Sequence, residues 1–190
     1  SDLGCLDATL IGLACDGRRV YAVAWGDGVL CLPPAMGGVV ILAYPSGAPF
    51  YPSYALDAAR CREYETEFGG DLVVHENGTK RRRSARTAPA FFASAAVDDV
   101  GPGFALTAFS DGIGAFRDQE MNIFDGVGLA EEFSAFKSRR GKYVERRFRK
   151  AMKTSLAAGQ QPFDDVSCAS ICEVNDENDI SQPADGKGED

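Results

Sequence analysis

The sequence contains a single histidine and no Cys-x-x-Cys pair, so it lacks the side chains from which zinc ribbons and thiol redox motifs are built. Its six cysteines are scattered, most of them in apolar, strand-like runs. Thiols in such runs behave as small hydrophobic side chains, and a chain of 190 residues can bury a core without a disulfide framework. We therefore expect a protein of the reducing cytoplasm.

Long apolar stretches are also missing. The longest runs, such as residues 38–44, are much shorter than the ~20 residues needed to cross a bilayer. The first fifteen residues have neither the basic start nor the small-residue cleavage pattern of a secretory signal. The sequence therefore predicts a soluble protein with no membrane partner.

Positive charge is in deficit: 20 Lys and Arg face 28 Asp and Glu, and the net charge is −8, which argues against generic nucleic-acid binding. Seven acids and one lysine lie from Glu173 onward, so the rest of the chain is nearly neutral. Residues 174–190 are polar, acidic and without aromatics, a composition that predicts a disordered tail. Residues 1–173 are expected to form one domain.

Basic residues gather at positions 80–83 and 139–150. Clusters of this kind can hold phosphate or an acidic partner. They can equally be a solvated loop and a solvated helix face, and the sequence leaves both interpretations open.

Short β-rich stretches dominate the first 110 residues. Asp16-Gly17 is a strong hairpin signal, so the two stretches on either side are predicted to pair antiparallel. Loops are predicted at residues 45–52 and 77–86, and a weak helix or irregular segment at 54–67. The expected strands are 8–15, 20–25, 28–32, 39–44, 72–75, 91–97, 104–109 and 165–172.

Two amphipathic helices are expected late in the chain, at residues 129–138 and 142–157, where apolar residues recur at helical spacing. Gly159 ends the second helix. Many short strands followed by late helices and one last strand are typical of an α+β fold with antiparallel sheets.

Three aspartates follow apolar strands: Asp27 in WGDG, Asp111 in FSDG and Asp164 in FDDVS. Carboxylates that converge from several strand ends form an oxygen-rich site suited to a hard cation such as Mg²⁺ or Mn²⁺. Taken singly, an Asp-Gly pair is more often only a turn.

Taken in order, these motifs resemble the type 2C metal-dependent serine/threonine protein phosphatases. Residues 7–10 (DATL) are similar to the family's small-residue and threonine motif, and residues 20–27 (VYAVAWGD) to the strand that ends in a Gly-Asp-Ser turn. Residues 104–112 (FALTAFSDG) resemble the strand that closes on Ser-Asp-Gly, and residues 164–167 (DDVS) resemble Asp-Asn-Val-Thr. The resemblance implies two antiparallel β-sheets packed as a sandwich and flanked by helices.

The resemblance also implies a reaction. Asp111 and Asp164 would bind two Mn²⁺ or Mg²⁺ ions, which activate a water for attack on phosphoserine or phosphothreonine. Asp27 would be an outer-shell residue or a ligand of an additional ion. The implied partners are a phosphoprotein substrate and a cognate kinase.

A bacterial branch of the family has a basic helix before its last metal motif, and residues 128–171 resemble that arrangement. The same helix pattern also fits an amphipathic helix packed on the outer face of a sheet.

Several family features are absent. The Glu-Asp pair and the Asp-Gly-His-Gly-Gly motif do not occur, and with them the family's bridging aspartate, proposed acid histidine and phosphate-gripping arginine are missing. His75 does not match the motif and is interpreted as an ordinary surface residue. Ala115 stands where another acid is frequent, and Gly28 and Val29 stand where Ser-Arg is usual.

Two functions therefore compete. In the first, the chain is the carboxy-terminal part of a phosphatase domain whose site is completed by a missing amino-terminal segment. In the second, it is a catalytically inactive pseudophosphatase that binds phosphoproteins or regulates a kinase. An ordinary α+β domain with fortuitous turns is the third interpretation.

Overall fold

The computed structural model describes residues 4–86 and 89–173, so the tail predicted at 174–190 lies outside the described residues. Helices and 3₁₀ turns are η1 (Gly4–Leu6), η2 (Pro34–Met36), α1 (Pro52–Leu56), α2 (Ala58–Phe68), α3 (Val97–Val100), η3 (Asp111–Gly114), α4 (Gly126–Ser134) and α5 (Tyr143–Ala157). Strands are β1 (Leu10–Cys15), β2 (Arg19–Trp25), β3 (Gly28–Cys31), β4 (Val39–Ala43), β5 (Asp71–Glu76), β6 (Thr79–Ser84), β7 (Phe91–Ala96), β8 (Ala105–Phe109), β9 (Phe116–Arg117), β10 (Gln161–Pro162) and β11 (Cys168–Cys172).

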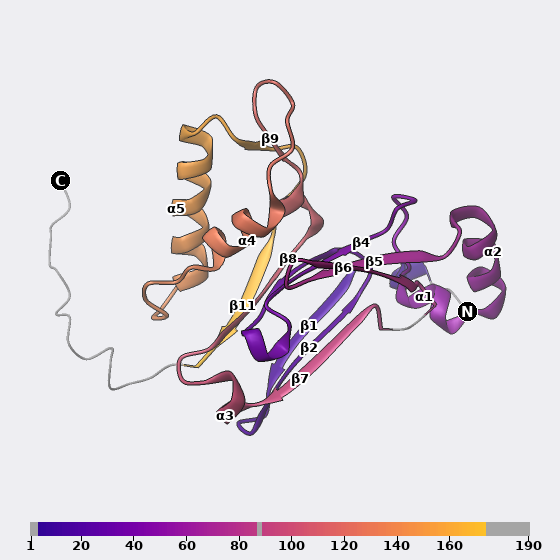
Figure 1. Ribbon diagram of the computed structural model, residues 1–190, viewed down its shortest axis with the longest axis horizontal. Helices are drawn as coiled ribbons and strands as arrows, with labels where there is room; N and C mark the ends of the chain where they lie inside the picture. Colours follow the sequence, from indigo (N-terminus) through magenta and orange to yellow (C-terminus); the bar gives the residue numbers. More distant parts are fainter. Residues whose placement is uncertain (1–3, 87–88, 174–190) are drawn as a thin grey trace, which may run out of the picture.

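The strands form one large and one small sheet, together with the short pair β10-β9. The large sheet has six strands in the order β11-β8-β3-β4-β5-β6, and the small sheet has the order β1-β2-β7 (Figure 1). Every pairing between named strands is antiparallel. The expected α+β class with antiparallel sheets is therefore confirmed, as is the hairpin at Asp16-Gly17.

The two larger sheets share one hydrophobic core. Alternate residues of β2 (Val20, Ala22 and Ala24) are fully buried, as expected when one face of a strand lies against another layer. They belong to the same buried cluster as inward-facing residues of the large sheet, namely Leu30, Val40, Leu42, Leu72, Val74 and Leu106. The sheets are thus packed face to face.

The opposite face of the large sheet is covered by α4 and α5, drawn in orange in Figure 1. Phe133 of α4 is buried between the sheet and α5, with its ring 6.5 Å from that of Phe109 and 5.3 Å from that of Phe148. Both contacts have the edge-to-face geometry that aromatic pairs favour. The long basic helix is therefore an outer layer of the sheet.

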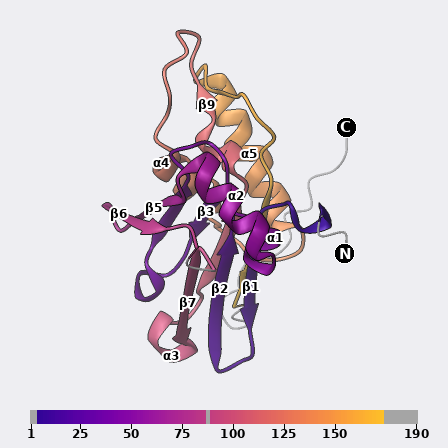
Figure 2. The same ribbon diagram turned by 90° about the vertical axis from the view of Figure 1, so that its right-hand side faces the viewer.

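An aromatic cluster at the other side of the molecule anchors α1 and α2, which face the viewer in Figure 2. Tyr64 is buried, and its hydroxyl donates a hydrogen bond of 2.6 Å to the Ala48 carbonyl oxygen. Asp57 caps α2 by accepting from the main-chain N–H groups of Ala59 and Arg60. The sequence pattern of residues 54–67 predicts either a weak helix or an irregular segment. These contacts stabilise the helix.

The predicted loop at 77–86 is wrong, because residues 79–84 form the edge strand β6. All six residues of β6 are exposed, and the strand is held by pairing with β5 around the two-residue turn Asn77-Gly78. An edge strand is held by backbone hydrogen bonds to one neighbour. Since both faces of β6 are exposed, its sequence lacks the alternation of apolar residues by which a strand is usually predicted.

The predicted helix at 129–138 is shifted. Asp125 caps α4 by accepting from the N–H groups of Val127 and Gly128, so the helix begins at residue 126 and ends at Ser134. Phe136 lies beyond the helix and packs edge-on against Tyr143, with ring centroids 5.0 Å apart. Within residues 4–86 and 89–173, no helix has the length and apolar character needed to span a bilayer.

Candidate functional site

Asp27 and Asp111 lie at the same end of the large sheet. Asp27 directly precedes β3, and Asp111 follows β8 with only Ser110 between. Because β3 and β8 are antiparallel neighbours, with Val29 opposite Phe109, the start of one strand meets the end of the other. Both aspartates line one cavity of about 410 Å³.

Asp164 joins them from the next strand. It lies four residues before β11, and β11 pairs with β8 so that Cys168 is opposite Phe109. Asp111 and Asp164 thus flank the paired strands β8 and β11 at the same end.

The charges of Asp27 and Asp164 act on the Asp111 carboxyl. The pKa of Asp111 is raised above its ordinary value, first by partial burial and then by the negative charges of Asp27 and Asp164. An ionised Asp111 is therefore less favourable here than in water, and a bound cation would offset that cost. The metal-ligand role of each residue stays a prediction.

The FSDG and DDVS turns are joined by hydrogen bonds through Ser110. The Ser110 hydroxyl donates to the Asp165 carbonyl oxygen and accepts from the Ser167 N–H, both at 3.0 Å. The Ser110 N–H donates to the Ser167 carbonyl oxygen at 3.1 Å. These hydrogen bonds continue the pairing of β8 with β11 beyond the strand ends, as far as the residues next to Asp111 and Asp164.

The DATL and WGDG segments are joined in a similar way. The Thr9 hydroxyl donates a 2.8 Å hydrogen bond to Oδ1 of Asp27, which holds that carboxylate beside the cavity. Gly26 has a positive φ of 84°, and a β-carbon there would lie 2.5 Å from Thr9 Oγ1. Only glycine fits this turn without displacing the threonine.

Two further groups near the aspartates were not singled out from the sequence. Arg117 lines the cavity, and its Nη1 donates to the Phe116 carbonyl oxygen at 2.9 Å, so a positive charge faces the same space. The pKa of Tyr51 is raised, first by burial and then by the Asp27 charge, with Asp111 also contributing. Neither residue belongs to a recognisable motif, so spacing alone gave no signal for them.

The ligand set for a metal is incomplete. In the part of the chain that the structure describes, no group of three or more His, Cys, Asp or Glu side chains is arranged closely enough to hold an ion. The aspartates offer the negative charge and the oxygen atoms that a divalent cation prefers, but they do not enclose one. His75 is part of β5 and lines a different cavity, together with Cys31 and Glu131.

Comparison of the chain with protein-family models, curated proteins and solved structures found no match.

Proposed function

We propose that this chain carries part of the active site of a type 2C-like phosphatase, which hydrolyses phosphoserine and phosphothreonine in proteins with Mn²⁺ or Mg²⁺. The observation that carries the proposal is the convergence of Asp27, Asp111 and Asp164 at one end of neighbouring strands, where burial and the charges of Asp27 and Asp164 raise the pKa of Asp111. The shared core of the two larger sheets supports the sandwich architecture that this family implies.

Each element of the site has a part in the proposed chemistry. Asp111 and Asp164 would hold the cations, which supply a water of lowered pKa. Asp27, fixed by Thr9, would orient water around the ions. Arg117 presents a guanidinium whose remaining N–H groups suit phosphoryl oxygens.

Ligand count favours a site that is completed from elsewhere. Two hard cations each take about six oxygen ligands, of which three aspartates supply only a minority. We infer that the remaining carboxylates come from a segment that precedes this sequence in the natural protein. The second candidate, a pseudophosphatase that binds phosphoproteins, is favoured by the absence of a closed metal-ligand group among the described residues.

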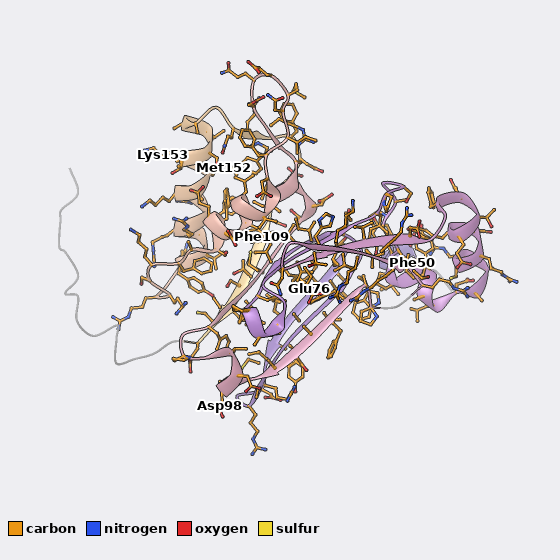
Figure 3. All side chains as sticks on the ribbon, viewed as in Figure 1. Phe50, Glu76, Asp98, Phe109, Met152 and Lys153 are labelled. Atoms are coloured by element: carbon orange, nitrogen blue, oxygen red, sulfur yellow. The ribbon has the colours of Figure 1, made fainter. Side chains whose placement is uncertain are left out.

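Metal binding is tested by adding Mn²⁺ to the isotope-labelled chain and recording which amide signals broaden. Paramagnetic broadening detects even a weakly held ion, so it suits an incomplete site. We expect early broadening around Asp27, Asp111 and Asp164, and its loss in Asp111→Asn. The matched control is Asp98→Asn, an exposed aspartate at the far end of the small sheet (Figure 3). Unchanged broadening in Asp111→Asn would contradict the assignment.

Catalysis is tested with an aryl phosphate and Mn²⁺, using this chain, the chain extended by its preceding segment, and the extended chain carrying Asp111→Asn. We expect little activity from the first, substantial activity from the second, and a loss of about 100-fold or more in the third. An inactive extended chain that still binds phosphoprotein would favour the pseudophosphatase.

A further inference from the structure

A second cavity, of about 250 Å³, lies against the first turns of α5 and shares no lining residue with the aspartate cavity. Its charged lining is entirely basic, supplied by Lys137, Arg146, Arg147 and Lys150. Ser138 and Tyr143 complete its polar wall. This cavity lies in the second of the two basic clusters found in the sequence.

Among the described residues, few acids lie near the cations of this cavity in the sequence. Residues 137–153 contain nine Lys and Arg and one acid, Glu145. That glutamate pairs with Lys142 and Arg149, neither of which lines the cavity. Among the described residues, no carboxylate forms an ion pair with any of the four lining cations. They therefore create a local positive potential.

Two of the cations are already oriented by the main chain. Arg146 Nη2 donates to the Arg140 carbonyl oxygen at 2.7 Å, and Arg147 Nε donates to the Glu132 carbonyl oxygen at 2.6 Å. Each guanidinium has five N–H donors in a fixed plane, so donors remain for a ligand. Holding the planes in place lowers the entropic cost of binding.

Arg139 adds an independent observation. Its Nε is buried and has no hydrogen-bond partner among the described residues, although buried donors are nearly always satisfied. Arg139 adjoins the lining residue Ser138 in the chain, and its positive charge acts on Tyr143, which lines the cavity. The Tyr143 hydroxyl donates to the Ser170 carbonyl oxygen at 3.0 Å. It therefore does not occupy the N–H donors of the basic side chains in the lining.

We propose that this cavity binds the phosphate of a phosphorylated serine or threonine side chain on a partner protein, independently of the aspartate site. Arginine and lysine together are the usual ligands of a phosphate dianion, by paired hydrogen bonds and by charge. The small, concave space suits one tetrahedral group on a short stem, whereas a membrane surface is read by a flat polybasic face with apolar side chains. The net charge of −8 disfavours long polyanions such as nucleic acid.

The test uses the whole 190-residue chain and a short neutral peptide that carries one phosphoserine, with its serine analogue as the reference. Affinities are measured by titration calorimetry in EDTA. Removing divalent ions prevents hydrolysis and leaves the aspartate cluster negative, so that it repels phosphate. Binding at the basic cavity is thereby separated from the function proposed above.

The informative variant is Lys150→Gln, which removes an exposed lining cation, and its matched control is Lys153→Gln, one turn further along α5 and outside the lining (Figure 3). We expect phosphopeptide affinity to fall about tenfold in Lys150→Gln and to stay within about twofold in Lys153→Gln. Adding the phosphopeptide to the unaltered chain should also shift the NMR signal of the Arg139 Nε–H group.

Equal affinity for the phosphoserine and serine peptides would overturn the proposal. So would equal losses in Lys150→Gln and Lys153→Gln, which would indicate diffuse attraction to the helix. Binding to vesicles of phosphatidylcholine and phosphatidylserine is measured as well. A chain that binds these vesicles but not the phosphopeptide would overturn the proposal and show that the basic surface binds membranes.

Discussion

Gly112 lies so close to Asp165 that a β-carbon on residue 112 would be 2.3 Å from the Asp165 carbonyl oxygen. The obstacle is main chain, which cannot rotate away, so the turn after β8 and the approach to β11 must separate if a side chain is added. The glycine of the FSDG motif is therefore required by packing between the two motifs that carry Asp111 and Asp164.

We expect Gly112→Ala to destabilise the fold by about 1–3 kcal/mol, the usual cost of forcing atoms into a packed site. The matched control is Gly114→Ala in the same 3₁₀ turn, because a β-carbon there meets nothing within 4 Å. It should change stability by no more than about 0.5 kcal/mol. Urea unfolding of both variants measures the difference, and equal midpoints would show that the turn relaxes freely.

The sheets could be predicted because their buried strands alternate or concentrate apolar residues. β2 is buried at Val20, Ala22 and Ala24, and every residue after Arg19 in its sequence, RVYAVAW, is apolar or aromatic. β6 was missed because TKRRRS is a solvent-exposed edge whose pairing depends on backbone groups. Asn77-Gly78 was the available signal, since Asn-Gly between two candidate strands favours a two-residue hairpin.

The aspartates of the candidate site could be predicted because each follows a strand within a recognisable turn. What joins them could not be predicted, because the Ser110 bridge to Asp165 and Ser167 spans 55 or more positions of sequence. The same holds for Arg117, which reaches the cavity through the path of the chain after η3.

The hydroxyl of Ser110 should contribute measurably to stability. Ser110→Ala removes one donor and one acceptor, and it leaves the Ser167 N–H without its side-chain partner, so we expect a loss of about 1–2 kcal/mol. Ser167→Ala is the matched control, because Ser167 contacts Ser110 through its main-chain N–H and carbonyl oxygen. The midpoint of thermal unfolding should fall well below that of the parent only in Ser110→Ala. Similar losses of stability in both variants would contradict a structural role for the Ser110 hydroxyl.

The thiols should differ widely in reactivity. Cys31 is buried under α4, and burial raises the pKa of its thiol to about 11, whereas Cys15 is exposed. Because the thiolate is the reactive form, we expect iodoacetamide at about pH 8 to label Cys15 at least about a hundredfold faster than Cys31. Peptide mapping by mass spectrometry after brief labelling measures both rates. Comparable rates would mean that the layer between α4 and the sheet opens readily.

Asp111 should make stability depend on pH in a defined direction. Its folded-state pKa is raised, first by burial and then by the charges of Asp27 and Asp164, so the folded protein holds this proton more tightly than the unfolded chain does. The stabilising contribution is therefore present below the unfolded pKa of about 3.8 and is lost as pH rises through the folded value. At neutral pH without metal, the ionised carboxylate weakens the fold.

Asp111→Asn replaces that charge by a neutral group of similar shape. In EDTA at about pH 7 we expect it to be more stable than the parent by about 0.5 kcal/mol, a modest gain because the site is partly solvated and screened. The midpoint of thermal unfolding should then rise by about 1–2 °C. At about pH 3.5 the advantage should shrink, because the parent carboxyl is then largely protonated in both states. Asp98→Asn, exposed on α3, should shift neither midpoint appreciably. An Asp111→Asn protein that is less stable than the parent at neutral pH would show that the carboxylate is held by favourable contacts, and the charge cluster would lose its basis as a cation site.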